Sequence, residues 1–96
     1  MRKITEEAIS AFLAGQDFHK SNTQVVVSEN ETSLFLHGNK IAKLDNKGVL
    51  SITTAGWPSP TTRERLNGLP GVSVYQKDHT LYLNNQEWDG SWTEVS

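Results

Sequence analysis

Cysteine is absent from this chain of 96 residues. The chain can therefore form no disulfide and has no thiolate to act as a nucleophile or metal ligand, and a small protein without disulfides suits the inside of a cell. Long apolar runs are missing too, since none approaches the roughly 20 residues needed to span a bilayer. Near the N-terminus, Glu6 and Glu7 stand where a signal peptide would need unbroken apolar residues. We therefore expect a soluble cytoplasmic protein that is neither secreted nor membrane-spanning.

An excess of basic charge is also lacking, because 9 basic and 11 acidic residues leave a formal net charge of −2. The molecule as a whole then has no attraction for phosphate, so any binding to nucleic acid would depend on a local basic patch. This balance makes nucleic-acid binding less expected without excluding it.

The patterns of common enzyme and metal sites do not occur in the sequence. His19, His37 and His79 stand far apart and none has a second histidine at helical spacing, so a metal site would have to gather distant ligands. No serine occupies a Gly-x-Ser-x-Gly turn. The acidic residues fall mostly at turns and chain ends, which is usual for solvated loops. We expect no catalytic residue, no metal site and no cofactor.

The sequence does contain the signals of a short N-terminal helix over residues 5–14. Thr5 is a suitable N-cap and Gly15 a suitable end. Ile9, Phe12 and Leu13 have the three-and-four spacing of an apolar stripe. The pattern predicts an amphipathic helix that docks on a sheet.

After this helix the period of the pattern changes to two, which is typical of strands. Segments rich in β-forming residues lie at 25–27, 34–36, 41–44 and 49–54, and turn residues separate them. A second alternating pair, 72–75 and 80–83, predicts a C-terminal hairpin. The expected fold is one α+β domain over residues 1–96, in which helix, antiparallel meander, short crossover helix and hairpin share a core; residues 1–4 and 94–96 are expected to fray.

The segment GWPSPTTRERLNGLPG, residues 56–71, joins the meander to the hairpin. Ser59 is a strong N-cap and Pro60 suits the first helical position, so a helix of about two turns is expected here. One interpretation is a plain connector in which Arg63, Glu64 and Arg65 point partly into solvent. The other is a binding surface, where arginines and threonines around a helix start attract an anionic or acidic partner and Trp57 adds a stacking face.

Two further tryptophans, Trp88 and Trp92, flank the segment Asp89-Gly90-Ser91. If that segment is a turn, both rings lie on one side of it. They can cap a small core, which needs large buried side chains, or serve as an exposed aromatic anchor for a partner.

Three groups of residues carry a resemblance that covers almost the whole chain: His37-Gly38-Asn39; then Gly56, Trp57, Thr61, Thr62, Arg65, Leu66 and Asn67; then Trp88-Asp89-Gly90. The sequence resembles a family of small, mostly uncharacterised proteins encoded by bacteriophages and other mobile elements. Asn85 departs from the family pattern, where a glycine is common at that turn.

The resemblance implies an accessory protein made in the cytoplasm of the infected bacterium. Such a protein would act by occupying a surface of host machinery, for example a defence complex, a nuclease or a polymerase, and would not be an enzyme. The candidate contact residues are Trp57, Thr61, Thr62, Arg63, Arg65, Asn67, Trp88 and Trp92. The alternative is a nucleic-acid-binding protein that uses Arg63, Arg65, Lys40, Lys43 and Trp57.

Overall fold

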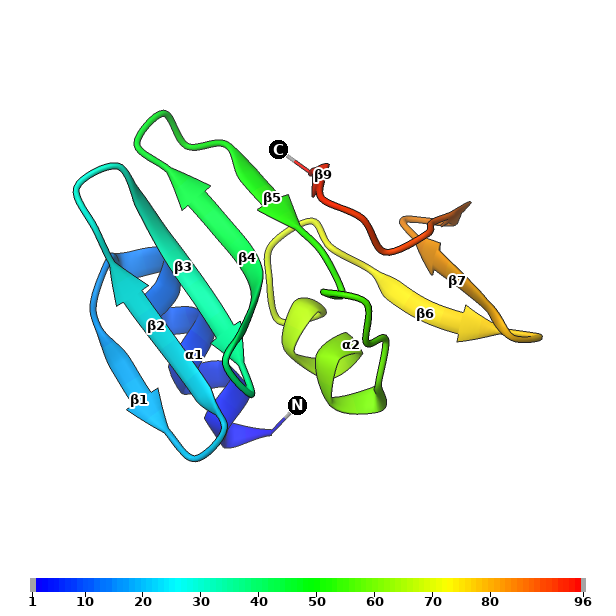
Figure 1. The fold of residues 1–96 in the computed structure, drawn as a ribbon, viewed down its shortest axis with the longest axis horizontal. Helices are drawn as coiled ribbons and strands as arrows, with labels where there is room; N and C mark the ends of the chain where they lie inside the picture. The colour runs from blue at the N-terminus through cyan, green and yellow to red at the C-terminus, as the bar shows by residue number, and fades with distance from the viewer. Residues whose placement is uncertain (1, 96) are drawn as a thin grey trace.

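A computed structural model describes residues 2–95, and within them the chain forms two helices and nine short strands (Figure 1). The elements are α1 Lys3–Ala14, β1 Phe18–Lys20, β2 Thr23–Val27, β3 Glu31–Leu36, β4 Asn39–Asp45, β5 Leu50–Ile52, α2 Pro60–Leu66, β6 Val74–Lys77, β7 Thr80–Leu83, β8 Gln86–Glu87 and β9 Thr93–Glu94. This order confirms the expected α+β fold. Neither helix is long and apolar enough to cross a membrane.

A six-stranded antiparallel sheet, in the order β1-β2-β3-β4-β5-β9, forms the larger part of the molecule. Strands β2 to β5 are the predicted meander. The two outer strands, β1 and β9, were not predicted. Between β3 and β4 the register shifts, because Leu34 pairs with Ala42 while Phe35 pairs with Lys40. Ile41 is the extra residue of this bulge, and its side chain enters the core.

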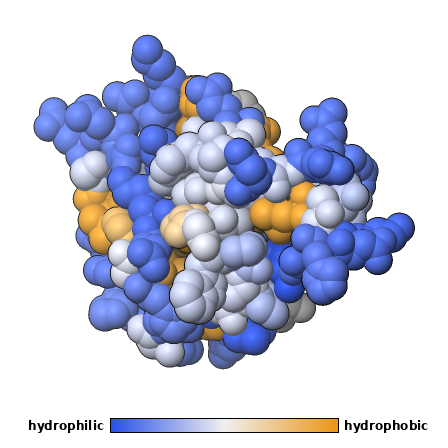
Figure 2. Space-filling model, turned by 45° about the vertical axis from the view of Figure 1, so that its right-hand side comes forward, coloured by the Kyte–Doolittle hydropathy of each residue, from blue (hydrophilic) through white to orange (hydrophobic). Residues whose placement is uncertain are grey.

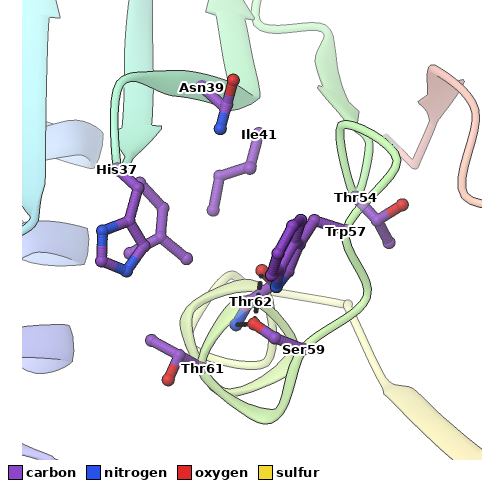
Figure 3. A pocket seen from close by; sticks show the side chains of 9 residues that line it. His37, Asn39, Ile41, Thr54, Trp57, Ser59, Thr61 and Thr62 are labelled. Carbon is purple, nitrogen blue, oxygen red and sulfur yellow. Dashed lines mark hydrogen bonds between the residues drawn. The ribbon is translucent and has the colours of Figure 1, made fainter.

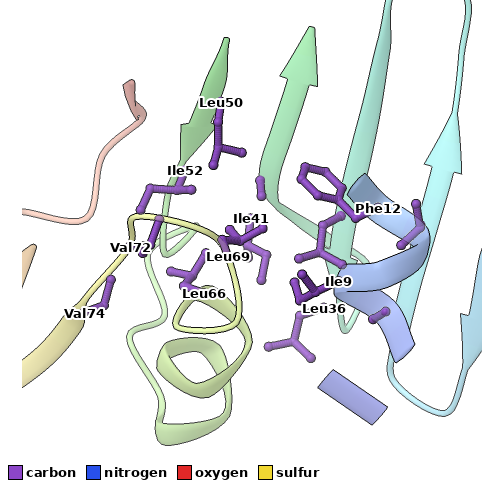
Figure 4. Packing of buried hydrophobic residues seen from close by; sticks show 14 of the residues in the cluster. Ile9, Phe12, Leu36, Ile41, Leu50, Ile52, Leu66, Leu69, Val72 and Val74 are labelled. Atoms are coloured by element: carbon purple, nitrogen blue, oxygen red, sulfur yellow. The ribbon is translucent and has the colours of Figure 1, made fainter. Parts of the chain in front are cut away.

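Helix α1 lies on one face of this sheet, behind β2 and β3 in the view of Figure 1. Ala8, Ile9, Ala11 and Phe12 are its buried apolar residues, and Phe12 lies next to the strands in Figure 4. Gly15 ends the helix in the left-handed conformation, with a φ of 66° and its N–H directed at the carbonyls of the last turn. This end was predicted correctly.

Two details of the predicted helix are wrong. The helix begins at Lys3, and Thr5 is a buried residue inside it rather than its N-cap. The Thr5 hydroxyl is engaged by Glu64 and Arg65 of α2, so a tertiary contact uses the group expected to cap the helix. Leu13 is 47% exposed, so it lies outside the apolar stripe.

Helix α2 and a second sheet, β6-β7-β8, complete the fold. Leu66 and Leu69 from the α2 segment and Val72 and Val74 from the chain into β6 join the same hydrophobic cluster as Ile52 of β5 (Figure 4). The predicted hairpin is confirmed as β6 and β7, where Val74 pairs with Leu83, and it projects away from the larger sheet (Figure 1).

The C-terminal segment returns to the larger sheet through Gly90. Its carbonyl accepts hydrogen bonds from the Thr53 hydroxyl at 2.5 Å and the Thr54 N–H at 2.9 Å. Strand β9 then pairs with β5, with Ile52 opposite Thr93. Of the ends expected to fray, Met1 and Ser96 lie outside the described residues, whereas Ile4 lies in α1 and Glu94 in β9.

Candidate functional site: a pocket beside Trp57

A pocket of about 470 Å³ lies between the β3–β4 turn and the loop that leads into α2 (Figure 3). Its lining residues come from three places that are distant in sequence: Leu36, His37, Asn39 and Ile41 around the turn; Thr54, Trp57 and Ser59 in the loop; Thr61 and Thr62 in α2. Leu36 and Ile41 are buried and supply apolar surface. The other residues supply the Trp57 indole, the His37 imidazole, one amide and several hydroxyl groups.

A tight turn presents Trp57 at this pocket. The Trp57 N–H donates to the Thr54 carbonyl at 3.0 Å, and the two residues between them, Ala55 and Gly56, have φ values of 56° and 78°. Two successive left-handed residues define a type I′-like turn, which glycine adopts freely and alanine adopts at a cost. The Thr53 hydroxyl accepts a bond from the Ala55 N–H at 3.1 Å, which helps to hold the turn. Trp57 is left 70% exposed.

The N-terminus of α2 forms a second wall, and its cap was predicted correctly. The Ser59 hydroxyl accepts from the Thr62 N–H at 3.2 Å and lies 3.0 Å from the Thr62 hydroxyl. Thr62 is also buried, and its N–H and hydroxyl both interact with the Ser59 cap. Thr61 is half-buried, and within residues 2–95 its hydroxyl makes no hydrogen bond.

The β3–β4 turn, His37-Gly38-Asn39, supplies the remaining rim. His37 and Gly38 both have left-handed φ values, 52° and 79°. The His37 N–H donates to the Asn22 carbonyl at 2.8 Å, and its ring Nε2 lies 3.4 Å from the Asn22 side-chain amide. These residues were not predicted as site residues. The sequence shows that these residues form a turn, but it does not show that the turn lies near α2. Only the folded chain brings the two together.

Arg65 corrects the expectation that both arginines of α2 reach solvent, because its side chain is only 1% exposed. Its Nε donates to the Thr23 hydroxyl at 3.1 Å, and its Nη1 donates to the Thr5 hydroxyl at 2.7 Å and to Glu64 Oε1 at 2.5 Å. The guanidinium thus connects α2 to α1 and β2 inside the molecule. Arg65 is removed from any contact surface of the folded protein.

Glu64 is the partner that balances this buried cation. Burial alone would raise the pKa of Glu64, but hydrogen bonds from the Thr5 hydroxyl and the Arg2 N–H, together with the Arg65 charge, outweigh it. The pKa of Glu64 therefore lies below its ordinary value of 4.5. The carboxylate is ionised in the folded protein at neutral pH.

Asn67 and Arg63 also have positions that the sequence did not reveal. The Asn67 side chain accepts from the Val74 N–H at 2.6 Å and donates to the Val74 carbonyl at 2.8 Å, as a neighbouring strand would. Arg63 is half-buried, and its Nε is buried without a hydrogen bond among the described residues. Neither residue lines the pocket.

The two C-terminal tryptophans differ from each other. Trp88 packs against the core, and its indole N–H lies 3.1 Å from the Ser91 carbonyl and 2.9 Å from the Thr93 hydroxyl, with both as acceptors. Trp92 is 44% exposed, and the Lys43 ammonium lies 4.6 Å from its ring centroid. Neither residue is part of the pocket, so the structure does not bring together all the predicted contact residues.

Lys43 belongs to the face of the six-stranded sheet that is opposite α1, the face toward the viewer in Figure 1. On this face Lys40 lies 5.9 Å from the Phe35 ring centroid and 2.7 Å from the Glu31 carboxylate. The hydrogen bond from Lys40, with a second from Ser33, holds the pKa of Glu31 below its ordinary value. The face thus combines lysines with aromatic rings, although a carboxylate partly offsets the positive charge.

The surface around the right-hand side of the molecule is mixed in polarity. Figure 2 shows small, separate orange areas and a pale centre formed by residues of intermediate hydropathy. Among residues 2–95, no three histidine, aspartate or glutamate side chains are gathered as a metal ion would require.

Comparison with curated proteins and with solved structures gives no match. A protein-family model does match: the model described as Kyanoviridae Gp96 protein aligns with residues 1–94, almost the whole chain. The phage part of the resemblance is thereby confirmed. The chain belongs to the Kyanoviridae Gp96 family of phage proteins.

Proposed function

We propose that this phage protein is a non-enzymatic binding protein that acts in the cytoplasm of the bacterial host by contacting a host protein. Its contact site is the Trp57 pocket. The effect of the contact is inhibition of host defence or of other host machinery. One observation supports this proposal above the others: Trp57 is 70% exposed beside a pocket with the buried apolar residues Leu36 and Ile41 in its lining.

The energetics of tryptophan make that observation informative. An exposed indole leaves a large apolar area in water, at a cost of roughly 25 cal/mol per Å², which a partner that covers it recovers. Tryptophan beside a preformed pocket is also typical of the few residues that carry most of the binding energy at protein interfaces. A rigid turn and a capped helix hold both walls, so little ordering entropy is lost on binding.

The candidate contact residues reduce to a smaller set on this proposal. Trp57 and Thr61 contact the partner directly, with Thr62 at the pocket wall. Trp92 is exposed but lies outside the pocket and is not part of the proposed contact, while Arg65, Asn67 and Trp88 hold the fold.

Affinity capture from host lysate tests the proposal. The tagged wild-type protein should capture a specific host protein. Trp57→Ala should capture about tenfold less of that protein, as expected when an interface anchor is removed. Trp92→Ala is the matched control, because it removes the other exposed tryptophan from outside the pocket. Equal capture by the wild type and Trp57→Ala would contradict a role for the pocket.

A second candidate function, nucleic-acid binding, is favoured by the lysine and aromatic pairs on the open sheet face. Lys43 with Trp92 and Lys40 with Phe35 could track a backbone and stack bases. Arg65, which the sequence suggested as part of a basic patch, cannot contact nucleic acid because it is buried. The remaining positive charge is small, which makes this function the weaker candidate.

A gel-shift assay with single- and double-stranded DNA at low and moderate salt decides the second candidate. Binding that weakens steeply as salt rises, and weakens further in Lys43→Ala, would support nucleic-acid binding. The absence of a shift at low salt would eliminate it.

A further inference from the structure

We infer, building on the proposed function, that the Trp57 pocket binds an uncharged segment of the partner protein through one aromatic side chain. The aromatic ring stacks on Trp57 and packs on Leu36 and Ile41. The neighbouring peptide groups bond to the polar rim. This chemistry follows from the charge, the shape and the unused hydrogen-bonding groups of the pocket.

The lining of the pocket favours an uncharged occupant. Among the described residues, the nine that line the pocket include no aspartate, glutamate, lysine or arginine. A carboxylate or ammonium group entering the pocket would lose water without meeting a lysine, arginine, aspartate or glutamate in return, which is costly. An uncharged occupant loses far less hydration.

The shape and the walls favour an aromatic ring. Aromatic rings prefer offset stacking or edge-to-face contact with another ring, and either contact adds to the gain from covering apolar surface. In Figure 3 the Trp57 ring lies across the pocket from His37, and Ile41 appears between and above them in that view. A volume of about 470 Å³ lies in the range of sites that hold ligands larger than one methyl or isopropyl group.

The rim carries polar groups that the fold does not use. Within residues 2–95, the Asn39 side-chain amide and the Thr61 hydroxyl make no hydrogen bond, whereas Ser59 and Thr62 bond to each other. An amide and a hydroxyl can each donate and accept, which matches the N–H and C=O groups of an extended peptide. These two groups lie on different walls of the pocket, the β3–β4 turn and α2.

A nucleobase could also stack on an indole, but the pocket lacks what nucleic-acid binding needs most. The main attraction in such complexes is between phosphate and lysine or arginine. Neither residue type occurs in the lining. A protein segment is therefore the occupant that these contacts favour.

Blocked tripeptides test this inference on the full-length protein. Titrations of Ac-Ala-Phe-Ala-NH₂, Ac-Ala-Glu-Ala-NH₂ and Ac-Ala-Lys-Ala-NH₂ are followed by amide and indole chemical shifts in NMR spectra, with uridine 5′-monophosphate as the nucleotide probe. We expect the phenylalanine peptide to shift Trp57, Thr61 and Asn39, and to bind about tenfold or more tightly than the charged peptides, because ring burial supplies that difference. Binding should be lost in Trp57→Ala and kept in Trp92→Ala.

Each other outcome overturns the inference: no shift at the pocket, shifts centred on Trp92, equal binding of a charged peptide, or tighter binding of the nucleotide there. Retained folding of Trp57→Ala is checked from its dispersed amide spectrum. The capture experiment is independent of this one. If capture depends on Trp57 but no tripeptide binds, the proposed function stands and the inference is overturned. If the phenylalanine tripeptide binds but capture does not depend on Trp57, the inference stands and the proposed function is overturned.

Discussion

At the scale of single residues, the buried Arg65 side chain joins several elements of the fold. Its guanidinium reaches Thr5, Thr23 and Glu64, which belong to α1, β2 and α2. A buried cation is tolerated only when hydrogen bonds and an opposite charge replace the water that it loses. These hydrogen bonds tie α2 to α1 and to β2, because Thr5 and Thr23 belong to those two elements.

Replacing Arg65 by methionine should lower the free energy of unfolding by about 3 kcal/mol, since the Glu64 carboxylate and two hydroxyls lose their shared donor. Urea unfolding followed by circular dichroism measures the loss. Arg63→Met is the matched control on the same helix. It should cost less than about 1 kcal/mol, because Arg63 makes no ion pair within the described residues. Similar losses in both variants would contradict the role assigned to Arg65.

Gly90 is a second residue whose identity the fold requires. It has a φ of 85°, and a Cβ atom there would lie 2.4 Å from the Thr54 hydroxyl oxygen. Gly90→Ala should therefore combine backbone strain with a steric clash. We expect it to destabilise the protein by about 2 kcal/mol or more.

Gly48→Ala separates the two causes at Gly90. Gly48 has nearly the same φ, 86°, but a Cβ atom there would meet nothing within 4 Å. Gly48→Ala should lower the free energy of unfolding by only about 1–2 kcal/mol, which is the cost of backbone strain alone. Thermal or urea unfolding of the pair should show the larger loss at Gly90, and an equal loss would mean that the contact with Thr54 relaxes without cost.

At the scale of elements, Asn67 links α2 to the second sheet. The paired bonds between its side chain and the Val74 backbone occupy the edge of β6 at that residue. An edge strand with an occupied backbone is less available to pair with another molecule. Asn67 was a candidate contact residue, and its position gives it a definite role within the fold.

Asn67→Ala should lower stability by about 1.5 kcal/mol, because two buried or half-buried hydrogen bonds are lost. Hydrogen exchange measured by NMR should show a faster rate at the Val74 amide in particular. Asn85→Ala, in the turn between β7 and β8, should leave that amide protected. Unchanged Val74 protection in Asn67→Ala would show that the pairing adds little to the strand.

At the scale of the whole molecule, four carboxylates share a lowered pKa, and they occupy different parts of the fold. Hydrogen bonds to the ionised carboxylates are what mainly lowers these pKa values. At Glu64 burial acts in the opposite direction, and the hydrogen bond from Thr5 works against it. The other donors are Lys40 to Glu31, the Val49 N–H to Asp45, and Ser91 to Asp89. When a folded-state pKa lies below the unfolded value, the unfolded chain binds more protons in acid. These carboxylates therefore make their whole contribution to the free energy of unfolding at pH values above their unfolded-state pKa. That contribution is lost as the pH falls through their folded-state pKa.

We therefore expect the urea midpoint to be nearly constant from pH 7 to about pH 5 and to fall as the pH drops below about 4.5. Glu64→Gln should be less stable than the wild type at pH 7, and the difference should shrink as the pH falls through the lowered pKa of Glu64, because the wild-type carboxylate then becomes protonated. Parallel pH profiles for the two proteins would show that Glu64 does not contribute to acid sensitivity.

Much of the fold was predictable because its signals are local. Alternating β-formers between Asn, Asp and Gly turns determine β2 to β5 and the β6–β7 hairpin. Ser59 followed by Pro60 determines the start of α2, and Gly15 determines the end of α1. The short outer strands β1 and β9 were missed, since β9 has only two residues and becomes a strand through pairing with β5. A pattern of period two needs more residues than that to be visible.

The α+β class, the Ser59 cap of α2, the Gly15 end of α1 and the turns could be read from the sequence, since each depends on side chains within a few residues of one another. The packing of the folded chain was needed to reveal that Arg65 is buried, that Asn67 pairs with β6, and that the His37 turn faces Trp57 across a pocket. Arg65 and Thr5 are 60 positions apart in the chain. A contact at that separation leaves no periodic or local trace, because it depends on how the helices and sheets pack against each other.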